Sequence, residues 1–119
     1  MAVLSTHTLD SVSGNSAKNV RVQFFRLLGD CDKELIFDKR TNKEGRLSET
    51  FESGGAPAEE YELVFHSGDY LGQQNFQEAN PVMDSVVFRL NVRDFERRYH
   101  IPFLIAPHNF TVWWSGTPV

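Results

Sequence analysis

The chain has 119 residues, enough for one domain with its own hydrophobic core and too few for two ordinary domains. Its 40% apolar and 24% charged residues are typical of a globular protein rather than a disordered one. With 12 basic and 16 acidic residues the net charge is −4, which argues against nucleic acid as a partner, because such binding depends on the neutralisation of phosphates.

Short apolar segments separated by turn residues predict a series of β-strands. The alternation of apolar and polar residues is clearest in Asn19–Leu28 and in Val86–Val92. Phe25 and Leu27 continue the first of these on its second face, which indicates either a β-bulge or a face buried at both ends. The predicted strands, in chain order, are Val3–Leu9, Asn19–Leu28, Leu35–Phe37, Leu47–Phe51, Tyr61–Phe65, Val86–Val92, Tyr99–Ile105 and Phe110–Trp114, with one short helix that begins at Ser67. Seven or eight such strands predict an all-β sandwich, formed by residues 1–119 as a single domain.

Neither a membrane span nor a secretory signal is visible. No window approaches the roughly 20 apolar residues of a spanning helix, and Met1–Asp10 has no basic start and no apolar segment. We therefore expect a soluble, cytoplasmic protein with no membrane partner. The single cysteine, Cys31, cannot form an intrachain disulfide. The adjacent carboxylates of Glu59 and Glu60 are expected at a solvated edge.

Four histidines are the side chains whose ordinary pKa lies nearest neutral pH: His7, His66, His100 and His108. Their spacing matches no local metal-binding motif, and a structural zinc site has no Cys/His pairs to build on. The spacing leaves open that two or three of them converge in the fold around a metal. We interpret His66, at the end of a strand, and His108, in a turn, as structural residues.

Four segments carry motifs of one known family. LSTHTLD at residues 4–10 is similar to that family's beginning, and YHIPFLIAP at residues 99–107 is similar to its near-terminal signature. Residues 41–46 match a T-N-x-x-G-R turn, and residues 65–70 match the segment before a short helix. The chain thus resembles the transthyretin-related 5-hydroxyisourate hydrolases. The resemblance implies a transthyretin-like (prealbumin-like) β-sandwich and a homotetramer, a dimer of dimers with active sites at the dimer–dimer interface.

Three positions separate the hydrolases of this family from the hormone-carrying transthyretins, and here they are His7, Arg46 and His100. The resemblance implies a cyclic-amide hydrolase that acts on a small oxidised purine, with no metal and no cofactor. A neutral imidazole can accept a proton from water, so His7 and His100 are expected to share the acid–base work. Arg46 stays protonated, and it is expected to hold the substrate's oxygens and the developing oxyanion.

The C-terminal segment departs from the family pattern. Where the hydrolases end in Tyr-Arg-Gly-Ser, this chain has Trp113, Trp114, Ser115 and Gly116. One hypothesis is that the substrate is an N-methylated analogue of 5-hydroxyisourate, whose methyl groups pack against indole. The alternative is a non-catalytic protein that binds a flat aromatic ligand. Adjacent strand residues face opposite ways, so only one indole is expected to line the pocket, and the resemblance favours Trp114. Ser115 or Thr117 would supply the hydroxyl of the family's terminal serine.

Overall fold

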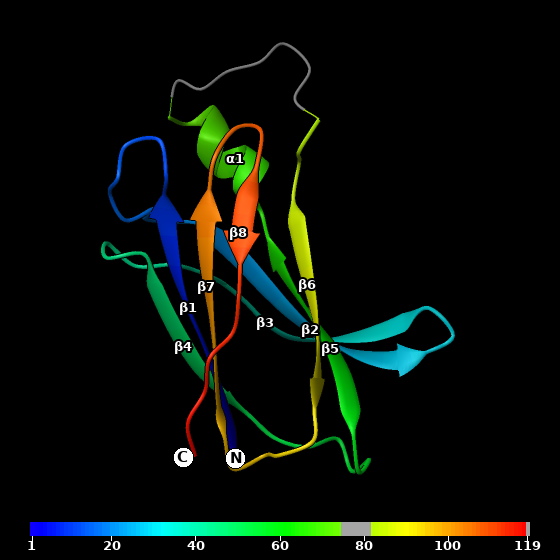
Figure 1. The fold of residues 1–119 in the computed structure, drawn as a ribbon. Helices are drawn as coiled ribbons and strands as arrows, with labels where there is room; N and C mark the ends of the chain where they lie inside the picture. Colours follow the sequence, from blue (N-terminus) through cyan, green and yellow to red (C-terminus); the bar gives the residue numbers. More distant parts are fainter. Residues whose placement is uncertain (75–81, 119) are drawn as a thin grey trace.

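The computed structural model describes residues 1–74 and 82–118, in which two four-stranded sheets pack face to face (Figure 1). The strands are β1 (Ala2–Asp10), β2 (Arg21–Gly29), β3 (Asp32–Arg40), β4 (Arg46–Phe51), β5 (Glu59–Phe65), β6 (Val86–Val92), β7 (Arg98–Ile105) and β8 (Phe110–Val112), and α1 spans Ser67–Gly72. The strand order is β4-β1-β7-β8 in one sheet and β3-β2-β5-β6 in the other. The prediction of an all-β sandwich with one short helix is confirmed.

Aromatic side chains from both sheets fill the space between the layers. The Phe24 ring of β2 stacks on Tyr61 of β5 with centroids 5.0 Å apart, and the Phe65 ring of β5 meets Phe103 of β7 at 4.2 Å. All four side chains are fully buried. Burial of one such side chain contributes about 1.5–3 kcal/mol, so this row provides much of the energy that holds the sheets together.

The side chains of β1 that point into the core show which of its residues face outward. On β1, Leu4, Thr6 and Thr8 are inward and almost completely buried. Successive side chains of a strand point to opposite faces, so Ser5 and His7 belong to the outer face of the β4-β1-β7-β8 sheet. This alternation places a hydroxyl and an imidazole on the outer face of the sheet at β1.

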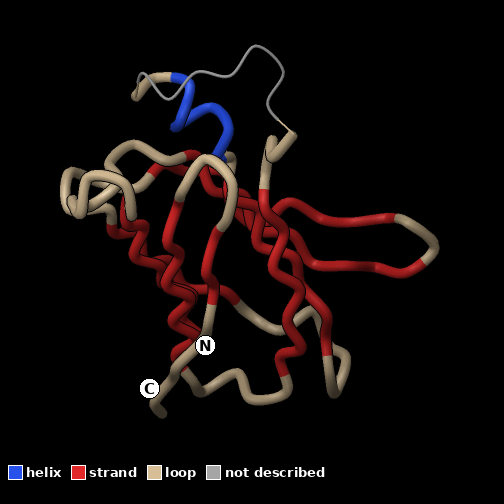
Figure 2. Tube along the Cα trace, turned by 45° about the horizontal axis from the view of Figure 1, so that its top comes forward, coloured by secondary structure: helices blue, strands red, loops and turns tan. Residues whose placement is uncertain are grey.

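Most strands differ from the prediction by one or two residues at an end, and β3 differs by more. β3 covers nine residues rather than three, because it pairs with β2 in a hairpin that projects beyond the sandwich (Figure 2). β8 ends at Val112, before both tryptophans. Of the two alternatives for the second strand, a register shift between Phe24 and Phe25 supports the β-bulge.

The expectation of a solvated edge at Glu59 and Glu60 is wrong for Glu59. Glu60 is exposed, but the Glu59 side chain is buried and accepts hydrogen bonds from the Gly54 backbone N–H and the Tyr61 hydroxyl. Its carboxylate also lies 3.5 Å from the Arg26 guanidinium. A buried carboxylate needs such partners, and they come from segments that only the fold brings together.

Candidate active site

The pairing of β1 with its two neighbours brings three predicted site residues onto one face. His7 on β1 lies opposite Arg46 in the antiparallel pairing with β4, and Ser5 lies opposite His100 in the parallel pairing with β7. Residues opposite one another share a face, as do Ser5 and His7 along β1. The three strands lie side by side in Figure 1. His7, Arg46 and His100 thus form one outward-facing group.

A tight turn before β4 sets the position of Arg46. The Asn42 side-chain oxygen accepts hydrogen bonds from the backbone N–H groups of Glu44 and Arg46 at 3.0 and 2.9 Å. Gly45 has φ +75°, and its carbonyl oxygen accepts a hydrogen bond from the Thr8 backbone N–H at 2.7 Å. The turn is therefore tied to β1 one residue after His7.

Replacement of Gly45 by alanine is expected to lower the free energy of unfolding by more than about 2 kcal/mol, as measured by urea denaturation. An alanine Cβ would overlap the Thr8 carbonyl oxygen, and positive φ disfavours any side chain. Gly72→Ala is the matched control, since its Cβ would meet no atom within 4 Å. Equal stability of the two variants would contradict the assigned role of Gly45.

An open cavity of about 400 Å³ lies beside this group. It is lined by Ser5, Thr6, Asn42, Arg46, Leu47, Ser48, Arg98 and His100. His7 stands on the same face without lining the cavity, and its Nε2 is 3.5 Å from the Ser16 hydroxyl, the outer limit of a hydrogen bond. One chain thus brings Arg46 and His100 into a shared cavity, with His7 next to Arg46.

The environment of His100 favours a neutral imidazole. Burial lowers the pKa of His100 below its ordinary value, and electrostatic interactions with Arg46, His7 and Arg98 lower this pKa further. Its Nδ1 lies 2.8 Å from the hydroxyl oxygen of Ser5, which is itself buried. At neutral pH the ring is therefore an uncharged imidazole held in place by Ser5. Its Nε2 has no such contact with Ser5 and can accept a proton, as a general base requires.

The sequence matches a model of the HIUase/Transthyretin family over residues 4–114. The chain belongs to this family. It is 33% identical over 112 residues to 5-hydroxyisourate hydrolase 2 of Rhizobium meliloti (strain 1021), covering 92% of both chains.

Solved structures of the HIUase/Transthyretin family have the same sandwich. The 5-hydroxyisourate hydrolase of Klebsiella pneumoniae superposes with a TM-score of 0.73 at 29% identity, over 95% of this chain and 98% of that one. Sea bream transthyretin superposes with a TM-score of 0.82 at 20% identity, over 98% and 97% of the two chains, and supports the fold alone.

The two tryptophans of this family member face opposite ways, as expected, but their placement differs from the prediction. The Trp113 backbone N–H donates to the Pro102 carbonyl oxygen, in the register that pairs His100 with Ser115. Trp113 and Ser115 therefore share the face of His100. Both are exposed, Trp113 at 44%.

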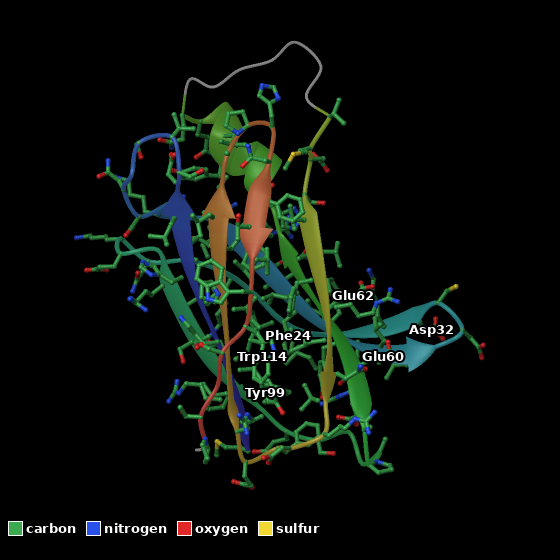
Figure 3. All side chains as sticks on the ribbon, viewed as in Figure 1. Phe24, Asp32, Glu60, Glu62, Tyr99 and Trp114 are labelled. Atoms are coloured by element: carbon green, nitrogen blue, oxygen red, sulfur yellow. The ribbon has the colours of Figure 1, made fainter. Side chains whose placement is uncertain are left out.

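Trp114 lies on the other side of β7, near Tyr99 in Figure 3, with ring centroids 6.1 Å apart. It lines a separate cavity with Tyr99 and Arg97. The prediction that Trp114 lines the pocket of His100 does not agree with this placement, because the strand register turns Trp113 to that face instead.

Sequence reasoning missed Ser5 and Arg98 as residues of this cavity. Both could have been found from alternation, since Ser5 lies two residues before His7 and Arg98 two residues before His100. Their meeting with Arg46, however, depends on the β1–β4 and β1–β7 pairings.

The remaining histidines lie away from this group. His66 Nε2 is 2.7 Å from the Gln23 side-chain oxygen in the other sheet, and His108 lies between β7 and β8. Within residues 1–74 and 82–118, no three His, Cys, Asp or Glu side chains gather closely enough to hold a metal ion. The same residues include no helix long and apolar enough to cross a membrane.

Proposed function

We propose that the protein is a hydrolase that opens the six-membered lactam ring of 5-hydroxyisourate or of an N-methylated analogue. The observation that carries the proposal is a pKa-lowered His100 in one cavity with the Arg46 guanidinium. The proposal is supported by relatives named 5-hydroxyisourate hydrolase, such as those at 33% identity over most of the chain.

In the proposed reaction His100 is the general base. With its Nδ1–H donating to the Ser5 hydroxyl oxygen, Nε2 keeps its lone pair toward the cavity. Water gives a proton to Nε2 as its oxygen bonds to the ring carbonyl carbon. The carbonyl oxygen becomes an oxyanion, which the Arg46 guanidinium stabilises.

The second half of the reaction breaks the ring. As the tetrahedral intermediate collapses, the carbon–nitrogen bond breaks and the leaving nitrogen takes the proton that His100 accepted from water, which restores the neutral imidazole of His100. His7 is the second imidazole of the site, and it orients the water or relays the proton from His100 to the leaving nitrogen. Trp113 and Ser115, on the face of His100, contact the planar substrate. No step requires a metal or a cofactor.

We further propose that the protein acts as a homotetramer in the cytoplasm, with the outer face of the β4-β1-β7-β8 sheet turned toward another subunit. Apolar side chains that remain partly exposed on this outer face, Leu9 of β1 and Leu104 of β7, support an interface there. Sedimentation analysis of the purified protein tests the assembly.

The test of the function is the rate at which freshly generated 5-hydroxyisourate and its trimethyl analogue lose absorbance. We expect acceleration of at least one substrate above its spontaneous decay. Stoichiometric ligand binding without acceleration of either substrate would overturn the proposal and favour a binding protein for a flat aromatic ligand.

Ser5→Ala is expected to lower kcat about three- to tenfold and to leave KM unchanged, because one hydrogen bond that orients His100 is lost. Steady-state kinetics on the accepted substrate measures both constants. Ser5→Thr keeps the hydroxyl and serves as the control, with kcat near that of the wild type. A change in KM alone would contradict a positioning role for Ser5.

A further inference from the structure

The outer face of the β4-β1-β7-β8 sheet carries positive charge and no carboxylate where its three long strands pair. The outward residues there are Val3, Ser5, His7 and Leu9 of β1, Arg46, Ser48 and Thr50 of β4, and Arg98, His100, Pro102 and Leu104 of β7. The protein as a whole has 16 acidic residues and a net charge of −4. A patch of opposite sign on such a chain indicates attraction to a negatively charged ligand.

Arg98 is the second guanidinium of this patch. It opens β7 two residues before His100, on the same face, and two residues along a strand span about 7 Å. Its side chain is exposed and lines the cavity that contains Arg46 and His100. It forms no ion pair with any residue in the part of the chain that the structure describes, so its charge is available to a ligand.

The cavity walls also lack any acidic residue that could offset these charges. All polar lining residues other than Arg46, Arg98 and His100 are neutral: Ser5, Thr6, Asn42 and Ser48. Placing two guanidiniums on one small cavity is electrostatically unfavourable without a ligand. An anion bound between them would remove this repulsion.

We propose that Arg98 is a specificity-determining residue which, with Arg46, selects an anionic oxidised purine over its neutral N-methylated analogue. The inference rests on the proposed function and deepens it by choosing between the two substrate classes. A ring N–H between two carbonyls can ionise, whereas an N-methyl group at that position cannot. The attraction from Arg98 is therefore available to the unmethylated ring alone.

The experiment compares Arg98→Gln with the wild type on 5-hydroxyisourate and on its trimethyl analogue. We expect KM for 5-hydroxyisourate to rise about two- to fivefold, which is the effect of losing one exposed pair of opposite charges. The value of kcat should not change. KM for the trimethyl analogue should not change. The wild-type preference for 5-hydroxyisourate should weaken with added salt, because exposed charges are screened.

Arg89→Gln is the matched control, since it removes one exposed positive charge from β6 in the other sheet. Arg98→Lys keeps the charge and should retain the preference. Equal effects of Arg98→Gln on both substrates, or none on either, would overturn the inference.

A binding measurement separates this inference from the proposed function. Calorimetric titration with urate anion and with tetramethylurate, which is methylated on all four ring nitrogens and cannot ionise, requires no turnover. A selective loss of urate affinity in Arg98→Gln supports the role of Arg98 even if the wild type hydrolyses neither substrate. Hydrolysis with unchanged urate affinity in the variant overturns the role of Arg98 and leaves the hydrolase assignment standing.

Discussion

Replacement of His100 by asparagine is expected to lower kcat for the accepted substrate by about 10²–10⁴-fold, the range for loss of a general base. Asparagine keeps a polar group of similar size near Ser5 but cannot accept a proton at neutral pH. The pH profile of kcat/KM is a second test of the role of His100. Wild-type activity should fall on acidification only below pH 6.5, since the pKa of His100 lies under its ordinary value.

His108→Asn is the matched control, because it removes an imidazole from the β7–β8 connection rather than from the cavity. It should keep wild-type kcat and the same acid limb. If His100→Asn also retains wild-type kcat and its acid limb, then His100 is not the base, and the mechanism must be rebuilt around His7.

Replacement of Arg46 by glutamine is expected to lower kcat about 10²–10³-fold, as for loss of an oxyanion-stabilising donor. The same change should move the acid limb to higher pH. The Arg46 charge disfavours protonation of His100 and lowers its pKa, so removing this charge lets the pKa rise toward its ordinary value. Rates measured between pH 5 and 8 record both effects.

Arg46→Lys separates charge from geometry. Lysine keeps the positive charge, so the acid limb should stay where it is in the wild type, but it lacks the planar fork of donors and should lose rate. An unshifted acid limb in Arg46→Gln would show that Arg46 does not act electrostatically on the titrating group.

Strand prediction succeeded where burial imposes an alternating pattern and failed where it does not. Val86–Val92 is recovered with both ends, because its inward side chains alternate in a half-buried strand. β3 is predicted only at Leu35–Phe37, since most of its residues are exposed in the projecting hairpin. Pairing with β2, rather than burial, defines the rest of that strand.

The C-terminal segment illustrates the limit of reasoning from resemblance. Alternation correctly predicts that Trp113 and Trp114 face opposite ways, but the direction of each depends on the register against β7. A shift of one residue exchanges the two faces. The family position of an arginine therefore favoured Trp114, whereas the pairing of His100 with Ser115 turns Trp113 to that side.

Apolar periodicity and local motifs lie in consecutive residues, so they are enough to predict the sandwich class, most strand positions, the family resemblance and the group of His7, Arg46 and His100. Three features appear only in the fold: the contact of Ser5 with His100, the carboxylate-free cavity that Arg98 shares with Arg46, and the burial of Glu59. These facts depend on which strands pair and in which register, and that is set by packing between residues far apart in the chain.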